Sequence, residues 1–187
     1  MALKATIYKA QINLADMDRH VYADIGITIA RHPSETDERM MVRVLALALG
    51  WPSDTSEGTI ELAKDMWEPD EPALWQKNFS DEILHWVEVG QPDDKRLMKA
   101  SGRARAVSVW AFQSSTPIWW DGLANKVTRA QNLTVWQLPT EQSQALATLA
   151  QRSMQLQITV QDGTVWVNDG EHNTEITPVA LRTATAS

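Results

Sequence analysis

One carboxylate stands inside an apolar stretch of the sequence, where its charge needs a partner. Residues 83–89 read Ile-Leu-His-Trp-Val-Glu-Val and are followed by a turn. Both alternating faces are largely apolar, which predicts a central strand covered on both sides. Burying the Glu88 carboxylate is costly unless a cation, a metal ion or a strong donor lies beside it. Either Glu88 is a structural carboxylate paired with Arg96 or Lys99, or it belongs to a functional site.

A second carboxylate lies on a predicted helix over residues 34–49, with Ser34 expected as its capping residue. At about 100° per residue, Glu38 shares the buried stripe of this helix with Val42 and Leu45. Two interpretations follow. Glu38 either favours the helix dipole and pairs with a nearby arginine, or it is a second acidic group directed at Glu88.

Basic residues gather just after the central strand, although the chain has a net charge of −7. Five cationic side chains fall in this short span: Lys95, Arg96, Lys99, Arg103 and Arg105. The net charge argues against wholesale binding to phosphate backbones, but the cluster suits a small phosphate-binding patch for nucleic acid. The alternative is the solvated end of an amphipathic helix. The four histidines show no metal-ligand spacing.

The elements that position these residues alternate between helix and strand in the middle of the chain. Strands are expected at residues 5–13, 22–30, 59–66, 83–89, 104–112, 132–138, 156–161, 164–167 and 174–179. Helices are expected at residues 34–49, 73–77, 94–101, 114–129 and 139–152. This order predicts an α/β fold, with a mixed sheet flanked by helices and antiparallel hairpins at its ends.

The last hairpin has a register that can be predicted. Asp162-Gly163 indicates a type I′ turn. That turn pairs Val160 with Val165 and Ile158 with Val167, and residues 180–187 are expected to be a frayed tail.

The bulk composition is ordinary for a globular protein. With 187 residues, 43% of them hydrophobic, we expect one domain over residues 1–187, with a monomer favoured. The chain has no cysteine and therefore no disulfide. Residues 1–10 lack the apolar core of a signal peptide, and no apolar run reaches membrane-spanning length. We therefore expect a cytoplasmic protein that does not enter a membrane.

Several stretches together closely resemble the YaeQ family over essentially the whole chain. They are residues 1–10, 30–36, 38–41, 70–72, 86–90, 92–93 and 161–163. This is a family of bacterial proteins without a settled biochemical function. The resemblance implies a variant of the PD-(D/E)XK nuclease fold, the restriction-endonuclease-like architecture.

The resemblance also implies a metal site. In that superfamily an Asp and a Glu hold Mg²⁺, and an acidic residue on the first core helix often completes the site. Carried over, Glu88 matches the glutamate, Asp70 the aspartate with Asp81 as the alternative, and Glu38 the helix acid. Carboxylate oxygens suit Mg²⁺, which stabilises charge on phosphate and activates water.

The chain departs from the motif at Gly90, which occupies the position of the lysine that assists the attacking water. Lys99 or Lys95 from the following helix is expected to replace it, and Gln91 offers a neutral donor. Two hypotheses follow. One is a magnesium-dependent phosphodiesterase or nuclease acting on nucleic acid. The other is a non-catalytic binding or regulatory protein, for example in transcription, with Trp119 or Trp120 on a partner surface.

Overall fold

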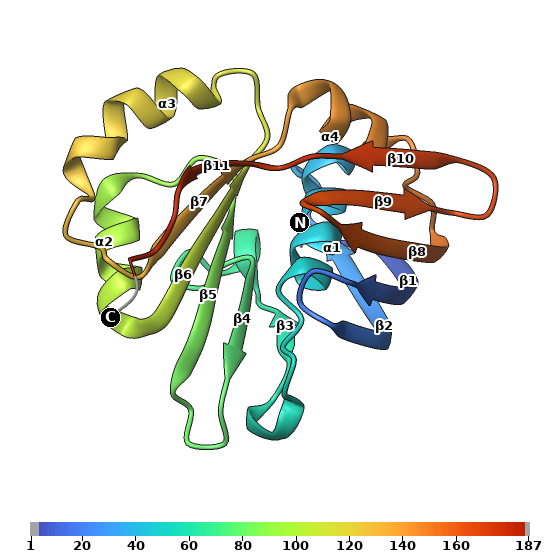
Figure 1. Ribbon diagram of the computed structural model, residues 1–187, viewed down its shortest axis with the longest axis horizontal. Coiled ribbons are helices and arrows are strands. Elements are labelled where there is room, and N and C mark those ends of the chain that lie inside the picture. The colour runs from blue at the N-terminus through green and yellow to red at the C-terminus, as the bar shows by residue number, and fades with distance from the viewer. Residues whose placement is uncertain (1–3, 186–187) are drawn as a thin grey trace. The chain divides into compact units, whose positions relative to one another are not determined.

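The computed structural model describes residues 4–185, and the chain divides into two compact units. The first unit holds the residues up to Ser53 together with Glu141–Thr177, and the second holds Asp54–Thr140 and the residues from Pro178 onward. Each unit has its own sheet and helices, so the architecture is mixed α/β as predicted (Figure 1). That residues 1–187 form one domain stays a prediction.

The first unit contains a five-stranded sheet of order β10-β9-β8-β1-β2. Its strands are β1 Thr6–Asp16, β2 Val21–Arg31, β8 Ser153–Gln161, β9 Thr164–Asn168 and β10 Asn173–Ile176. β1 runs antiparallel to β2 and parallel to β8, and the other neighbours are antiparallel. Along β1, the buried Tyr8, Ala10, Ile12 and Leu14 alternate with exposed side chains. One face of this sheet is therefore covered and the other faces solvent.

The helices of the first unit are α1 Asp37–Leu49 and α4 Thr140–Ala147. Every residue of α1 from Met40 to Ala48 is buried, so the helix is enclosed on nearly all sides. Met41 of α1, Leu146 of α4 and Leu156 of β8 line the same small interior void. Both helices therefore pack on the covered face of the sheet. α4 ends five residues before the predicted position at residue 152.

The predicted capping residue of α1 was wrong. Thr36 caps the helix, because its hydroxyl accepts a hydrogen bond from the Arg39 amide at 3.1 Å. The backbone at Thr36 is still extended, with φ −77° and ψ 158°, as an N-cap requires. Ser34 lies in the preceding turn, where its amide donates to Nδ1 of His32.

The predicted β8–β9 hairpin is confirmed with its register. Val160 lies opposite Val165, and Ile158 lies opposite Val167. Asp162 and Gly163 have φ values of 52° and 76°, so both central positions are left-handed, as a type I′ turn requires.

The second unit contains a six-stranded sheet of order β11-β7-β6-β5-β4-β3. Its strands are β3 Ile60–Leu62, β4 Leu74–Lys77, β5 Ile83–Val89, β6 Ala104–Ala111, β7 Leu133–Gln137 and β11 Val179–Arg182. β5, β6 and β7 are parallel, while β3, β4 and β11 pair antiparallel to their neighbours. The predicted central strand, β5, is therefore an interior strand with neighbours on both edges.

Helices cover one face of this second sheet. They are α2 Asp94–Arg103 and α3 Thr116–Leu123, with short 3₁₀ turns η1 Thr55–Glu57, η2 Asp65–Trp67 and η3 Ala124–Lys126 elsewhere in the unit. Leu97 of α2, Leu123 of α3 and Trp86 of β5 belong to one core cluster. Trp119 and Trp120 are both half-buried against this cluster, so neither is a freely exposed ring.

Residues 73–77 do not form the predicted helical turn. Residues 74–77 form β4, which pairs antiparallel with β5. Leu74 and Gln76 are buried and alternate with the half-buried Trp75, whose ring meets the edge of Trp86 at a centroid distance of 6.0 Å. The period of two that a strand requires is present, but the segment is too short to distinguish from one helical turn.

The predicted strand over residues 174–179 is divided between the two sheets. β10 ends at Ile176 in the first unit and β11 begins at Val179 in the second. Pro178 lies between them and has no amide proton for a ladder. Residues 180–182, predicted to fray, continue β11, and residues 186–187 lie outside the described part of the chain. β3 is shorter than the predicted 59–66 because η2 begins at Asp65.

Within residues 4–185, no helix is both long enough and apolar enough to span a membrane.

Candidate functional site

Glu88 lies on β5, on the strand face that packs under α2. Its side chain shares that face with Trp86, because residues two apart in a strand point the same way. Glu88 is buried, with a relative exposure of 6%. Its Oε1 accepts hydrogen bonds from Nε of Arg96 at 2.6 Å and from Nε1 of Trp86 at 2.8 Å. The structural interpretation of Glu88, an ion pair with Arg96, is therefore confirmed.

Arg96 is held in place by more than this ion pair. It lies in the first turn of α2, where its own amide donates to the capping carboxylate of Asp93 at 2.8 Å. Its terminal nitrogens donate to the carbonyl oxygens of Pro69 at 2.5 Å and Glu71 at 2.8 Å. The guanidinium thus joins β5, α2 and the segment before β4, and three of its N–H groups donate to fixed acceptors.

Burial raises the pKa of Glu88 above its ordinary value of 4.5. The positive charge of Arg96 and the hydrogen bonds from Trp86 and Arg96 act in the opposite direction, but desolvation is the larger effect. A buried carboxylate with a raised pKa is a frequent property of functional sites, although structural ion pairs share it.

Basic residues of α2 line a small pocket beside this ion pair. The pocket has a volume of about 200 Å³ and is lined by Asp70, Trp86, Lys95, Arg96, Lys99, Ala100 and Arg103. We call it the cationic pocket. Lys95, Lys99 and Arg103 are spaced four residues apart, so they lie along one stripe of the helix. The guanidinium of Arg103 is 5.1 Å from the centroid of the Trp86 ring.

Three of the predicted site residues are brought together in the cationic pocket: Asp70, Lys95 and Lys99. Asp70 is exposed there, whereas Asp81 lies in the β4–β5 turn with φ 62°. Glu88 lies behind the pocket, joined to it through Arg96. Asp70 is thus the better placed of the two candidate aspartates.

The other two predicted residues have separate partners. Nε2 of Gln91 donates to Oγ of Ser115 at 2.8 Å. Oε2 of Glu38 accepts a hydrogen bond from Oγ of Ser143 at 3.0 Å. Glu38 belongs to the first unit and Glu88 to the second, so the predicted convergence of these two carboxylates stays a prediction.

The residues around Glu88 do not fit a divalent cation as they are arranged. The Arg96 guanidinium occupies the position beside the carboxylate oxygen. No group of three His, Cys, Asp or Glu side chains able to hold a metal ion occurs in the part of the chain that the structure describes. Mg²⁺ prefers several carboxylate oxygens and water around it, and a bound guanidinium competes directly with it.

Sequence reasoning placed Arg103 in the basic cluster but did not foresee its contact with Trp86, and it assigned no site role to Trp86. The indole of Trp86 donates to Glu88 and forms a wall of the cationic pocket, and Arg103 packs over its ring. Two signals were available. Trp86 precedes Glu88 by two residues on the same strand face, and Arg103 continues the four-residue spacing of Lys95 and Lys99.

Comparison with known proteins gives consistent matches along the chain. The family described as "YaeQ protein" matches residues 1–178. The protein "Uncharacterized protein YaeQ" of Escherichia coli (strain K12) is 42% identical over 177 residues, which cover 94% of this chain and 95% of that protein. The protein of the same description from Salmonella typhi is 43% identical with the same coverage.

Two solved structures have the same fold. The crystal structure of YaeQ protein from Xanthomonas axonopodis pv. citri superposes with a TM-score of 0.90 at 37% identity, covering 97% of this chain and 100% of that one. The structure from Pseudomonas syringae gives a TM-score of 0.88 at 36% identity, covering 95% and 96%. The chain therefore belongs to the YaeQ family.

Proposed function

We propose that this protein binds phosphate groups of nucleic acid in the cationic pocket. The observation that carries the proposal is the grouping of Lys95, Lys99 and Arg103 on one helical stripe, beside Arg96. Lysine and arginine donate charge-assisted hydrogen bonds to phosphate oxygens, and such interactions supply most of the non-specific affinity for nucleic acid. The protein is acidic overall, so this local concentration of positive charge restricts binding to one small surface.

The composition of the pocket suits an anionic phosphate group. Four cationic side chains face one carboxylate, Asp70. Trp86 is buried, with a relative exposure of 3%, and forms the inner wall of the pocket.

The glutamate behind the pocket supports a binding role. The Glu88 carboxylate is neutralised by Arg96, and Arg96 is anchored by two backbone carbonyls. The positive charges of Lys95, Lys99 and Arg103 are therefore left for an anion, while the buried acid is already paired. A binding role of this kind corresponds to the second hypothesis from the sequence, a non-catalytic binding protein, and it names a phosphate group as the ligand.

The test is fluorescence anisotropy with labelled single-stranded DNA, double-stranded DNA and RNA over a range of KCl concentrations. The double variant Lys95→Ala/Lys99→Ala should bind more weakly, and the slope of log K against log[salt] should fall by about one for each phosphate that is no longer neutralised. Lys4→Ala/Lys9→Ala is the matched control, since it removes the same charge from exposed residues that do not line the pocket.

The same titrations contain the outcomes that would contradict the proposal. Equal affinities and equal salt slopes for the two double variants would show that the cationic pocket does not bind the nucleic acid. Inorganic phosphate and an unlabelled oligonucleotide are also compared as competitors of the labelled nucleic acid. If phosphate displaces the label at the same concentration as the oligonucleotide does, the pocket binds a small phosphorylated ligand instead.

Metal-dependent cleavage of phosphodiesters is the second candidate, and Asp70 favours it. This carboxylate shares the pocket with Lys95 and Lys99, the side chains expected to replace the lysine missing at Gly90. Glu88 would have to exchange Arg96 for the ion. The test is calorimetric titration of Mg²⁺ and Mn²⁺ into wild type, Arg96→Gln and Glu88→Gln, followed by a nuclease assay. Heats that appear only when Glu88 is intact support a metal site, whereas equal and negligible heats in all three exclude it.

A further inference from the structure

The first unit carries a second pocket, on the solvent-facing side of its sheet. This open pocket has a volume of about 440 Å³, within the range of about 300–1,000 Å³ found for ligand sites. Its lining is dominated by polar side chains from three strands and the end of a fourth. They are Gln11, Asn13, Asp24, Gln155, Gln157 and Asn168. We call it the amide pocket.

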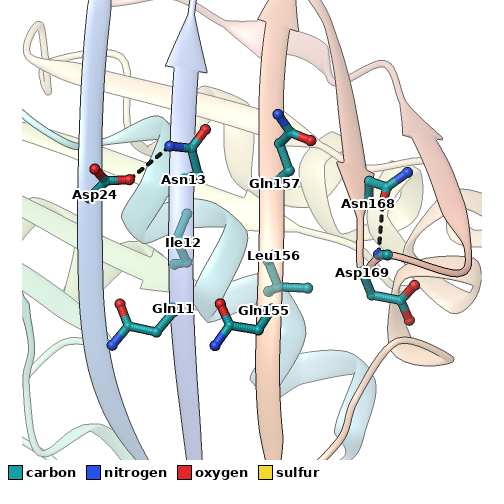
Figure 2. A pocket seen from close by; sticks show the side chains of 10 residues that line it. Gln11, Ile12, Asn13, Asp24, Gln155, Leu156, Gln157, Asn168 and Asp169 are labelled. Atoms are coloured by element: carbon teal, nitrogen blue, oxygen red, sulfur yellow. Dashed lines mark hydrogen bonds between the residues drawn. The ribbon is translucent and has the colours of Figure 1, made fainter.

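The strand register sets these amides in two neighbouring rows. Gln11 of β1 lies opposite Gln155 of β8, and Asn13 lies opposite Gln157. The second row continues to Asn168, which is opposite Gln157 on β9. Adjacent strands are about 4.8 Å apart, so each row presents carboxamides at that repeat. Figure 2 shows Gln11 and Gln155 side by side on their strands, on the same side of the sheet.

Some of these amides are oriented by the protein and others are available to a ligand. Nδ2 of Asn13 donates to Asp24 at 2.7 Å, and Oδ1 of Asn168 accepts from the Gly170 amide at 2.7 Å (Figure 2). The exposed side chains of Gln11, Gln155 and Gln157 form no hydrogen bond with the described residues. Each free carboxamide provides two donors and one acceptor with two lone pairs.

The charge of the amide pocket selects against anions. Among the described residues that line it there is no lysine, arginine or histidine, and the charged members are the carboxylates Asp24 and Asp169. Phosphate and sulfate groups would be repelled and would find no cation. A ligand of this pocket is therefore not an anion, and the carboxamides favour one rich in groups that both donate and accept hydrogen bonds.

Aromatic rings lie in the next row of the same sheet face. Tyr22 lies opposite Ala15, Ala15 opposite Thr159, and Thr159 opposite Trp166. Tyr22 has a relative exposure of 63%, and Trp166 is half-buried. The small side chains of Ala15 and Thr159 thus lie between two rings. Aromatic faces pack against the C–H faces of sugar rings, while neighbouring polar groups bind the hydroxyls.

We propose that this face of the sheet binds a neutral oligosaccharide. The carboxamides of Gln11, Gln155 and Gln157 hydrogen-bond to sugar hydroxyls, and Trp166 packs against a pyranose ring. This site is separate from the cationic pocket in both residues and chemistry, and it does not depend on nucleic-acid binding.

The experiment begins with an array that carries neutral, sialylated and sulfated oligosaccharides, probed with the full-length protein. The best neutral oligosaccharide is then titrated into ¹⁵N-labelled protein. The side-chain NH₂ signals of Gln11, Gln155 and Gln157 should shift, and Gln11→Ala/Gln157→Ala should weaken binding by about tenfold or more. Thr28→Ala is the control, because Thr28 is exposed on the same strand face and does not line the pocket.

Three results would overturn the proposal. The first is no neutral oligosaccharide bound with a Kd below about 5 mM. The second is a preference for sulfated or sialylated chains. The third is equal binding by the wild type and the Gln11→Ala/Gln157→Ala variant, with unfolding midpoints showing that both are folded.

Discussion

Arg96 binds Glu88 with a distance of 2.6 Å between Nε and Oε1, and it connects that buried carboxylate to the carbonyls of Pro69 and Glu71. This one guanidinium explains how an acidic side chain is kept on an interior strand. It also orders the segment before β4, which brings Asp70 to the cationic pocket. Structure and charge at the candidate site therefore depend on the same side chain.

Arg96→Ala should destabilise the protein by about 2–4 kcal/mol, because it leaves the Glu88 carboxylate buried with one donor. This loss of stability is toward the low end of that expected when a buried ion pair is broken, since the Arg96 side chain is 33% exposed. Urea unfolding followed by tryptophan fluorescence measures it. The control is Arg105→Ala, whose pair with Glu82 is exposed, and the urea midpoint should not move. Similar losses in both variants would contradict this account of Arg96.

The raised pKa of Glu88 predicts a specific pH dependence. The folded protein holds the Glu88 proton more tightly than the unfolded chain, so above pH 4.5 ionised Glu88 opposes folding. The wild type should therefore lose stability relative to Glu88→Gln as the pH rises from 4.5, and the difference should level off above the folded pKa. Below pH 4.5 the difference should be constant. Urea midpoints from pH 3.5 to 8 measure the trend, and a difference of the opposite slope would contradict a raised pKa.

Gly90 has φ 112°, a conformation that side chains other than glycine rarely adopt. The backbone of the turn between β5 and α2 therefore requires glycine at residue 90, the position where the motif has its lysine. Gly90→Lys and Gly90→Ala should both destabilise the protein by about 1–3 kcal/mol, since an added Cβ meets no atom within 4 Å and the cost is backbone strain alone. Chemical denaturation of both variants tests this. A loss in Gly90→Lys alone would mean that the side chain, not the backbone, is the obstacle.

Glu35 forms a buried ion pair with Arg43 and also binds Arg39 on the neighbouring turn of α1. Glu35→Ala should cost about 3–5 kcal/mol, because it leaves the Arg43 guanidinium buried without its carboxylate. The control is Asp37→Ala, which removes the partner of Arg31 from a pair whose side chains are 26% and 48% exposed and should cost about 1 kcal/mol. Equal costs would show that burial does not distinguish the two pairs.

The sequence indicated two possible partners for Glu88, and Arg96 is one of them. A strand, a tight turn and a helix in succession return the helix over the strand, so a residue eight positions later can reach back. The local order of strand, turn and helix does not predict which of Asp70 and Asp81 lies at the pocket. Both aspartates lie in loops, and Asp70 reaches the pocket through the hydrogen bonds of Arg96 with distant backbone carbonyls.

The division of the strands between two sheets was also beyond the sequence. The alternation of Gln11 and Asn13 with buried residues predicts one solvent-facing side of β1, and the same holds for Gln155 and Gln157 on β8. Neither pattern states that β1 and β8 are neighbours. The amide pocket is visible only after the register joins these two distant segments.

The parallel pairing of β1 with β8 has a consequence for synthesis on the ribosome. Residues 9–16 are made early, but their partners at 153–160 emerge only after the whole stretch Asp54–Thr140. At about 5–20 residues per second this delay is roughly 7–27 s. Throughout that interval the nascent β1–β2 hairpin has an open edge with unpaired amides and carbonyls. Strands β3 to β7 of the second unit therefore have time to form first, before β11 is made, and chaperones that mask strand edges should associate with the chain during this period.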